Sequence, residues 1–221
     1  MNSIADRRLE EKDRRRSEIL DAAATVAARD GIDGITMERV ARQARLSRAL
    51  LYVYFRDRDD LHLGLAERAL EQLKAQFGAA AAAGGTGLTQ VQAMGRAYID
   101  FARESPVHFA ALSHFHTSVA DVQAMAGCLG DCLHTGNEVH ALLMRSLEAG
   151  MQDGSIARAA GQPAAIAMTL WGFMHGIIQI STSKAGVLSQ YGLGDDALAN
   201  QALHLATRAL AVGAALPTGG R

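Results

Sequence analysis

Two short helices joined by a tight turn carry the residues of this sequence that are best suited to binding chemistry. The spacing of apolar residues predicts one helix over 36–44 and another over 47–54, with a three-residue turn between them. Thr36 and Ser47 stand where a side-chain oxygen can cap the helix that follows. This arrangement is a helix-turn-helix, in which the N-terminal end of the second helix enters the major groove of DNA.

The N-terminal end of the second helix has the small, apolar and cationic groups that read base edges. Arg48 can reach a guanine edge or a phosphate, and Ala49 and Leu50 can contact a thymine methyl group. Packing is an equal alternative for each of the two tyrosines of this helix. The residues expected to contact phosphates are Thr36, Tyr52, Tyr54 and Arg58, with Ser47 completing the set at the helix start.

The elements that must position these residues are helical. The chain of 221 residues contains 42 alanines, 3 prolines and 5% aromatic residues, which favours helix over strand, and no run alternates with period two. We therefore predict an all-α fold of about nine or ten helices. We expect a frayed arm over 1–13. The expected helices include 14–29, 135–152, 163–184 and 195–213. A further helix is capped by Asp57 and ends in an alanine-rich linker over 79–87.

Charge is unevenly distributed along the chain. The whole sequence has a formal net charge of −1, whereas residues 34–58 carry +4. This asymmetry fits a small nucleic-acid-binding module joined to a larger neutral domain, and a solvated arginine face is its structural alternative. Two cysteines form no disulfide framework, and the N-terminus has charges where a signal peptide needs an apolar run. We expect a cytoplasmic protein without a membrane partner, because the apolar run Ile166–Ile180 is too short to span a bilayer.

Several short blocks at fixed spacing together resemble the N-terminal domain of TetR-family transcriptional regulators. They are ILDAA at 19–23, DG at 30–31, TMERVA at 36–41, LSR at 46–48, LYVYF at 51–55 and RDDL at 58–61. Three positions depart from the family pattern, with Arg45 in the turn, Ala49 in place of a frequent glycine and Arg58 in place of the usual lysine. Arg45 adds a phosphate contact or alters the turn, so the operator sequence does not transfer from relatives.

The resemblance implies a DNA-binding domain over 1–62 and a ligand-binding and dimerisation domain over 63–221. Its last two long helices would pair with their copies in a homodimer, and a monomer core is the alternative. Both helices are apolar on more than one side. The interface residues we expect are Trp171, Ile178, Leu198, Ala202, Leu205 and Ala209. The residues expected to line an effector pocket, or else ordinary core, are Met94, Tyr98, Phe101, Phe109, Phe115, Met144, Trp171 and Met174.

The favoured function is a ligand-responsive transcriptional repressor that leaves a palindromic operator when a small apolar or amphipathic molecule binds. The partners are then double-stranded DNA, the effector and a second copy of the chain, with no cofactor and no metal. One alternative is metal or redox sensing by the histidines and cysteines of segment 108–140. A helical enzyme is the other, although we find no HExxH, GxSxG or P-loop motif and assign no catalytic residue.

Overall fold

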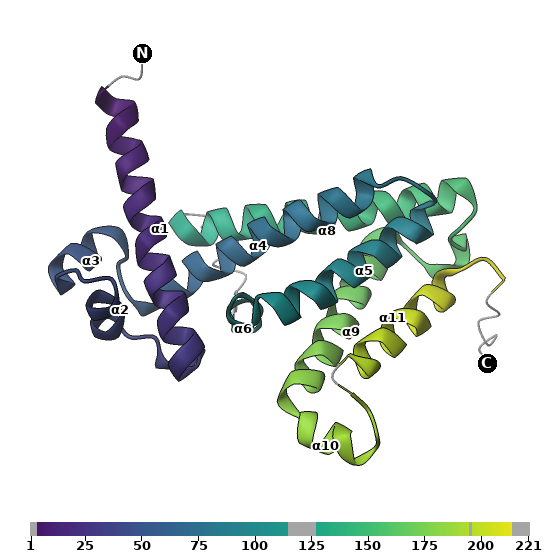
Figure 1. The fold of residues 1–221 in the computed structure, drawn as a ribbon. Coiled ribbons are helices and arrows are strands. Elements are labelled where there is room, and N and C mark those ends of the chain that lie inside the picture. Colours follow the sequence, from purple (N-terminus) through teal and green to yellow (C-terminus); the bar gives the residue numbers. More distant parts are fainter. Residues whose placement is uncertain (1–3, 115–126, 195, 214–221) are drawn as a thin grey trace. The chain divides into compact units, whose positions relative to one another are not determined.

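The computed structural model describes residues 4–114, 127–194 and 196–213, and these form ten α-helices and no β-strand. The predicted all-α fold is confirmed (Figure 1). The chain divides into two compact units. The first contains residues 1–71 and 105–135, and the second contains residues 72–104 and 136–221. Two helices, α4 (Arg58–Ala82) and α8 (Gly127–Asp153), each contain residues of both units.

The first unit is built around α1 (Ile4–Asp30), α2 (Met37–Gln43), α3 (Arg48–Tyr54) and the start of α4. Its core takes Ile19, Ala23 and Val26 from α1 and continues through each of the other helices. Ala111 of α6 (Pro106–Ser113) and Cys132 of α8 are buried in the same core. The unit therefore includes segments far beyond residue 62, and the boundary between separately folding domains remains a prediction.

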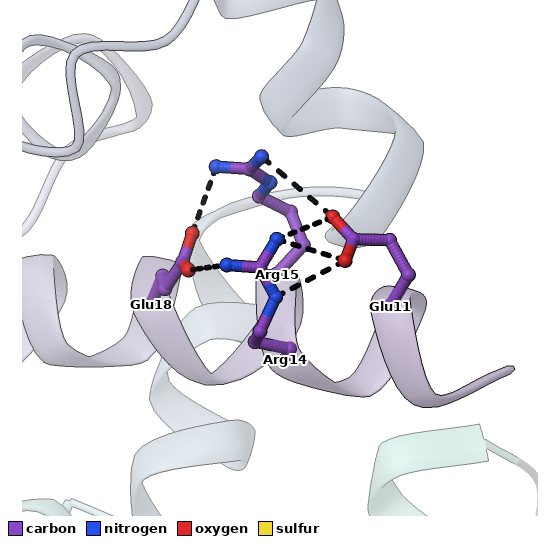
Figure 2. Close-up of polar contacts among 4 residues, drawn as sticks. All are labelled: Glu11, Arg14, Arg15 and Glu18. Carbon is purple, nitrogen blue, oxygen red and sulfur yellow. Dashed lines mark hydrogen bonds and ion pairs between the residues drawn. The ribbon is translucent and has the colours of Figure 1, made fainter. Parts of the chain in front are cut away.

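The expectation of a frayed arm over 1–13 is wrong for residues 4–13, which are helical. Charged side chains three and four residues apart stabilise α1 from Glu11 to Glu18. Arg14 pairs with Glu11 at 2.6 Å and with Glu18 at 2.8 Å, and Arg15 pairs with Glu18 at 2.8 Å. Figure 2 shows these four side chains along one side of the helix. Alternating charge thus extends α1 beyond the part that its apolar residues anchor.

The second unit contains α5 (Gly87–Glu104), the later part of α8, α9 (Pro163–Ser183), α10 (Ala185–Gln190) and α11 (Ala197–Leu210). α9 packs against α11 and α5, and α11 packs against α5. At the start of α5, Gly87 lies so close to the backbone of Gly150 that a side chain there would collide with it. These contacts fix the relative positions of α5, α8, α9 and α11 within the unit.

Three further helix limits differ from the sequence predictions. α4 continues to Ala82 through most of the expected linker, because alanine favours helix. α8 is unbroken from Gly127, so the start expected at residue 135 is wrong. The segment after α9, expected as a loop, contains α10. The sequence also predicts a helix over 119–130, most of which lies outside the described residues.

Candidate nucleic-acid interface

Side-chain caps fix the start of both short helices. The Thr36 hydroxyl accepts a hydrogen bond from the Arg39 backbone N–H at 3.2 Å, and the Ser47 hydroxyl accepts one from Leu50 at 3.1 Å. Both predicted caps are confirmed, and each is worth about 1 kcal/mol. The caps therefore fix the first turns of α2 and α3 on the two sides of the turn that joins the helices.

Arg45 shapes the turn itself. Its φ of 58° is in the left-handed region, which a residue with a Cβ occupies only at a cost. The Leu46 N–H donates to the Ala41 carbonyl at 2.9 Å and the Arg45 N–H donates to Arg42 at 3.2 Å, so backbone hydrogen bonds hold this conformation. The departure from a small residue is thus accommodated without losing the turn, and the guanidinium side chain is exposed.

α3 has a buried side and an exposed side, as predicted. Leu51, and Phe55 directly after the helix, are fully buried. The first turn of α3 and Tyr52 are exposed, and Tyr54 is half-buried against the core. Val53, which the sequence analysis did not single out, is 70% exposed and adds an apolar contact to this face. The expected DNA-binding residues are exposed except Tyr54: Thr36, Arg45, Ser47, Arg48, Ala49, Leu50, Tyr52 and Arg58.

The arginines around α3 differ in their partners. Arg42 pairs with Glu38 at 2.9 Å, and Arg39 approaches Asp30 at 3.4 Å. Arg45 and Arg48 have no ion pair with any residue that the structure describes. Their guanidinium groups are therefore available at the end of the helix that would enter a DNA groove.

An acidic pair organises the start of α4. The Asp57 carboxylate accepts a hydrogen bond from the Asp60 backbone N–H at 2.9 Å, which confirms Asp57 as the cap. Asp60 is buried and accepts from the Arg56 backbone N–H at 3.0 Å and from its Nη2 at 2.8 Å. The Arg56 side chain thereby holds the pKa of Asp60 below its usual range. Sequence reasoning missed the ion pair between Arg56 and Asp60, although its i, i+4 spacing is visible in the sequence.

The expected effector-site residues fall in both units. Met94, Tyr98, Phe101 and Met174 are buried in the second unit, Met144 is half-buried there and Trp171 is 44% exposed. Phe109 is buried in the first unit, and Phe115 lies outside the described residues. Half of the expected set is therefore buried in the second unit.

Tyr98 is at the centre of a polar and aromatic group in the second unit. Its hydroxyl is 2.7 Å from Nδ1 of His175, and its ring is stacked 6.4 Å from Phe101. Burial raises the pKa of Tyr98. A hydrogen bond with the Trp171 side chain lowers this pKa by a smaller amount. His140 meets the edge of Trp171 at 5.5 Å between ring centres. Burial lowers the pKa of both histidines, so they are neutral near pH 7.

The expected interface residues on α9 and α11 divide between inside and outside. Ile178 and Ala202 are buried within the single chain, whereas Trp171, Leu205 and Ala209 are exposed and Leu198 is half-buried. Phe173 and Ile180, which make this helix apolar on more than one side in the sequence, are also exposed on α9, and so is Met168, which sequence reasoning missed. α9 is also the one described helix long and apolar enough to cross a membrane by length and composition.

The described part of segment 108–140 brings no metal-ligand set together. Among the described residues there is no group of three histidine, cysteine or acidic side chains placed to hold a metal ion. The Cys132 side chain is buried in the core of the first unit. His116 and the side chain of Cys128 lie outside the described residues.

Comparison with protein families identifies the class that this fold and exposed helix define. The model for bacterial regulatory proteins of the tetR family matches residues 19–65, and a tetracyclin repressor-like C-terminal domain matches residues 91–206. Together the two matches cover more than half of the chain. The chain belongs to the tetR family of bacterial regulatory proteins, as its sequence blocks predicted.

Named relatives agree with this class, and a solved structure shares the fold. The chain is 28% identical to the HTH-type transcriptional repressor KstR of Mycolicibacterium smegmatis over 62% of its own length and 64% of KstR. It is 36% identical to the nicotine-responsive repressor HdnoR of Paenarthrobacter nicotinovorans over 27% of its own length and 30% of HdnoR. A structure of a protein with unknown function from Rhodococcus sp. RHA1 matches at a TM-score of 0.69 and 25% identity, covering 89% of this chain and 95% of that one.

Proposed function

We propose that the protein is a homodimeric transcriptional repressor that binds a palindromic operator and is released by a small neutral, amphipathic effector. The observation that carries the DNA assignment is the exposed first turn of α3, capped by Ser47 and anchored by buried Leu51 and Phe55. The relatives KstR and HdnoR are themselves named as transcriptional repressors. A cytoplasmic location follows from this function.

Each exposed residue of the helix-turn-helix has a distinct role in this proposal. Arg48 reads a guanine edge, while Ala49 and Leu50 contact thymine methyl groups. Thr36 at the start of α2, Tyr52, Tyr54, Arg45, Ser47 and Arg58 contact phosphates and fix the register of α3 in the groove. Tyr54 needs only its hydroxyl end for this, which is compatible with its half-buried ring.

The dimer interface is proposed to use the exposed apolar side chains of α9 together with α11. Trp171, Phe173 and Ile180 are each at least 40% exposed in the single chain. Burying such side chains is favourable by about 25 cal/mol per Å² of apolar surface. The other side of α9 packs on α5 and α11, so a second copy, rather than lipid around the whole helix, is the partner that suits the uncovered side. Sedimentation analysis at micromolar concentration tests this, and a monomer contradicts it.

The proposed effector site is the group around Tyr98 in the second unit. Tyr98, Trp171 and His175 supply hydrogen-bonding groups, and Met94 and Met174 are buried apolar side chains of the same unit. The buried polar residues described in this unit, Ser146 and Ser181, carry no charge. An ionised carboxylate or phosphate there would meet no buried lysine or arginine in the described part of this unit, and the histidines beside Tyr98 and Trp171 are neutral near pH 7, so its burial would carry a large energetic cost. A neutral ligand with a hydroxyl or keto group fits these surroundings.

Release from DNA then requires that the effector prefer one of two states of the dimer. α4 contains residues of both units, so it is the element proposed to transmit the change. A ligand shifts such an equilibrium only by its difference in affinity for the two states. A change from 1:99 to 99:1 needs a preference of about 10⁴-fold.

Binding to the DNA upstream of the protein's own gene tests the proposal. Arg48→Ala and Tyr52→Ala are expected to weaken binding of that DNA while the circular dichroism spectrum and the dimer are unchanged. Arg158→Ala, an exposed arginine in the second unit, is the matched control and is expected to bind as the wild type does. Unchanged binding by both α3 variants would overturn the assignment of α3.

A further inference from the structure

The first part of α1 carries its charges on separate sides. Residues 4–18 precede the segment that matches the tetR-family model, yet they continue the same helix. Arg8, Lys12 and Arg15 follow one another at helical spacing, and the next position in that series is Ile19, which is fully buried. The acidic residues Asp6, Glu10 and Asp13 lie on the opposite side of the helix at 100° per residue. We name the row Arg8, Lys12 and Arg15 the basic stripe.

Two cations of the basic stripe are unpaired. Glu11 and Glu18 are already bound by Arg14 and Arg15, as Figure 2 shows. Arg8 and Lys12 are exposed and have no ion pair with any described residue. The stripe therefore presents positive charge that neighbouring carboxylates do not neutralise.

The stripe begins beside the end of α3. Arg16 pairs with Glu67 of α4 at 2.8 Å, and its guanidinium lies 5.4 Å from the centre of the Phe55 ring, directly after α3. From this point residues 4–15 continue α1 for roughly 18 Å at 1.5 Å per residue. Figure 1 shows the N-terminal part of α1 extending past α2 and α3.

We propose that the basic stripe is a second DNA contact, which binds phosphates flanking the segment read by α3. The stripe continues the side of α1 that packs on the helix-turn-helix through Ile19, Ala23 and Val26, while the acidic side faces away. Flexible cations at helical spacing recognise the repeated charge of the DNA backbone and carry no base preference. This inference rests on the proposed DNA-binding function.

The double variant Arg8→Gln/Lys12→Gln tests the inference. Each phosphate contact contributes about 0.9 to the slope of log K against log salt concentration. Affinity is measured by fluorescence anisotropy from roughly 50 to 200 mM salt, on the upstream DNA and on a random-sequence duplex. We expect the slope to fall by roughly 1.8 for each bound helix-turn-helix, with the ratio of specific to random affinity unchanged.

The control variant Arg145→Gln/Arg158→Gln changes net charge equally at exposed positions of the second unit. It is expected to keep the wild-type slope. Equal slopes for the two double variants would overturn the basic stripe while leaving α3 as the DNA contact. A wild-type protein that binds neither duplex would instead overturn the proposed function and the stripe with it. Deletion of residues 1–13 is the second variant, and an unchanged slope there also contradicts the inference.

Discussion

Asp60→Asn should destabilise the protein by an amount that its hydrogen bonds set. The carboxylate accepts from the backbone N–H of Arg56 at 3.0 Å, from Nε at 3.0 Å and from Nη2 at 2.8 Å, and it is buried. Asparagine keeps one acceptor oxygen and loses the charge. Losing a charge-assisted hydrogen bond costs about 1.5–3 kcal/mol, and the exposed Arg56 guanidinium places the loss toward the lower end, at about 2 kcal/mol.

Thermal unfolding followed by circular dichroism measures this loss. For a chain of this length about 2 kcal/mol corresponds to a decrease in Tm of roughly 4–8 °C. Because Arg56 lowers the pKa of Asp60, the stabilisation is present above the ordinary carboxyl pKa and is lost as pH falls through the lower, folded-state value. The variant should therefore lose less stability than the wild type on acidification.

The matched control is Asp59→Asn. Asp59 is the neighbouring residue, and its side chain is 80% exposed, with its carboxylate 3.7 Å from Nε of Arg58. Loss of the Asp59 charge should therefore change the free energy of unfolding by less than about 0.5 kcal/mol. Equal decreases in Tm for the two variants would refute the reasoning, because burial and hydrogen bonding would then not decide the effect.

Three further changes test the second unit. Gly87→Ala should lower the free energy of unfolding by about 1–3 kcal/mol, because the new Cβ meets the Gly150 backbone. Gly78→Ala is the control, since a Cβ there has open space and should raise the free energy of unfolding by up to about 1 kcal/mol. Urea unfolding compares the two variants, and equal effects would contradict the close approach of Gly87 and Gly150. Tyr98→Phe should lower the free energy of unfolding by about 1 kcal/mol in the same assay, because the hydrogen bond to His175 is lost. In calorimetry the variant should also bind a neutral effector, such as a long-chain alcohol, more weakly. Unaltered affinity would exclude Tyr98 from the effector site. Because burial lowers the pKa of His175, the unfolded state binds more protons than the folded state below about pH 6.5. Stability should therefore fall as pH decreases toward about 5. His175→Asn should make this decrease of stability with pH smaller, which thermal unfolding at a series of pH values measures.

Local signals made the helix-turn-helix predictable from sequence. The caps at Thr36 and Ser47 and the burial of Leu51 and Phe55 depend on residues within a few positions of one another, and the structure has each of them. Helix limits were less predictable where charge or alanine replaced apolar periodicity. Ion pairs support α1 from Glu11 to Glu18, ahead of its apolar residues, and alanines extend α4 to Ala82.

Contacts between distant parts of the chain were not predictable. The hydrogen bond between Tyr98 and His175 joins residues 77 positions apart, and nothing local distinguishes it from ordinary core. Likewise, only packing decides that Ile178 faces inward while Phe173 is exposed, since α9 is apolar on nearly all sides. Phe109 is assigned to the first unit for the same reason, because α6 returns to the core around α1.

A footprint on the DNA upstream of the gene tests the central claim most directly, that two copies of α3 read a palindrome. The account predicts two protected segments on one face of the duplex, separated by about 34–36 Å or a multiple of it. Protection should disappear with Arg48→Ala and persist with Arg158→Ala. A single protected segment, or protection that survives the Arg48 change, would contradict the claim.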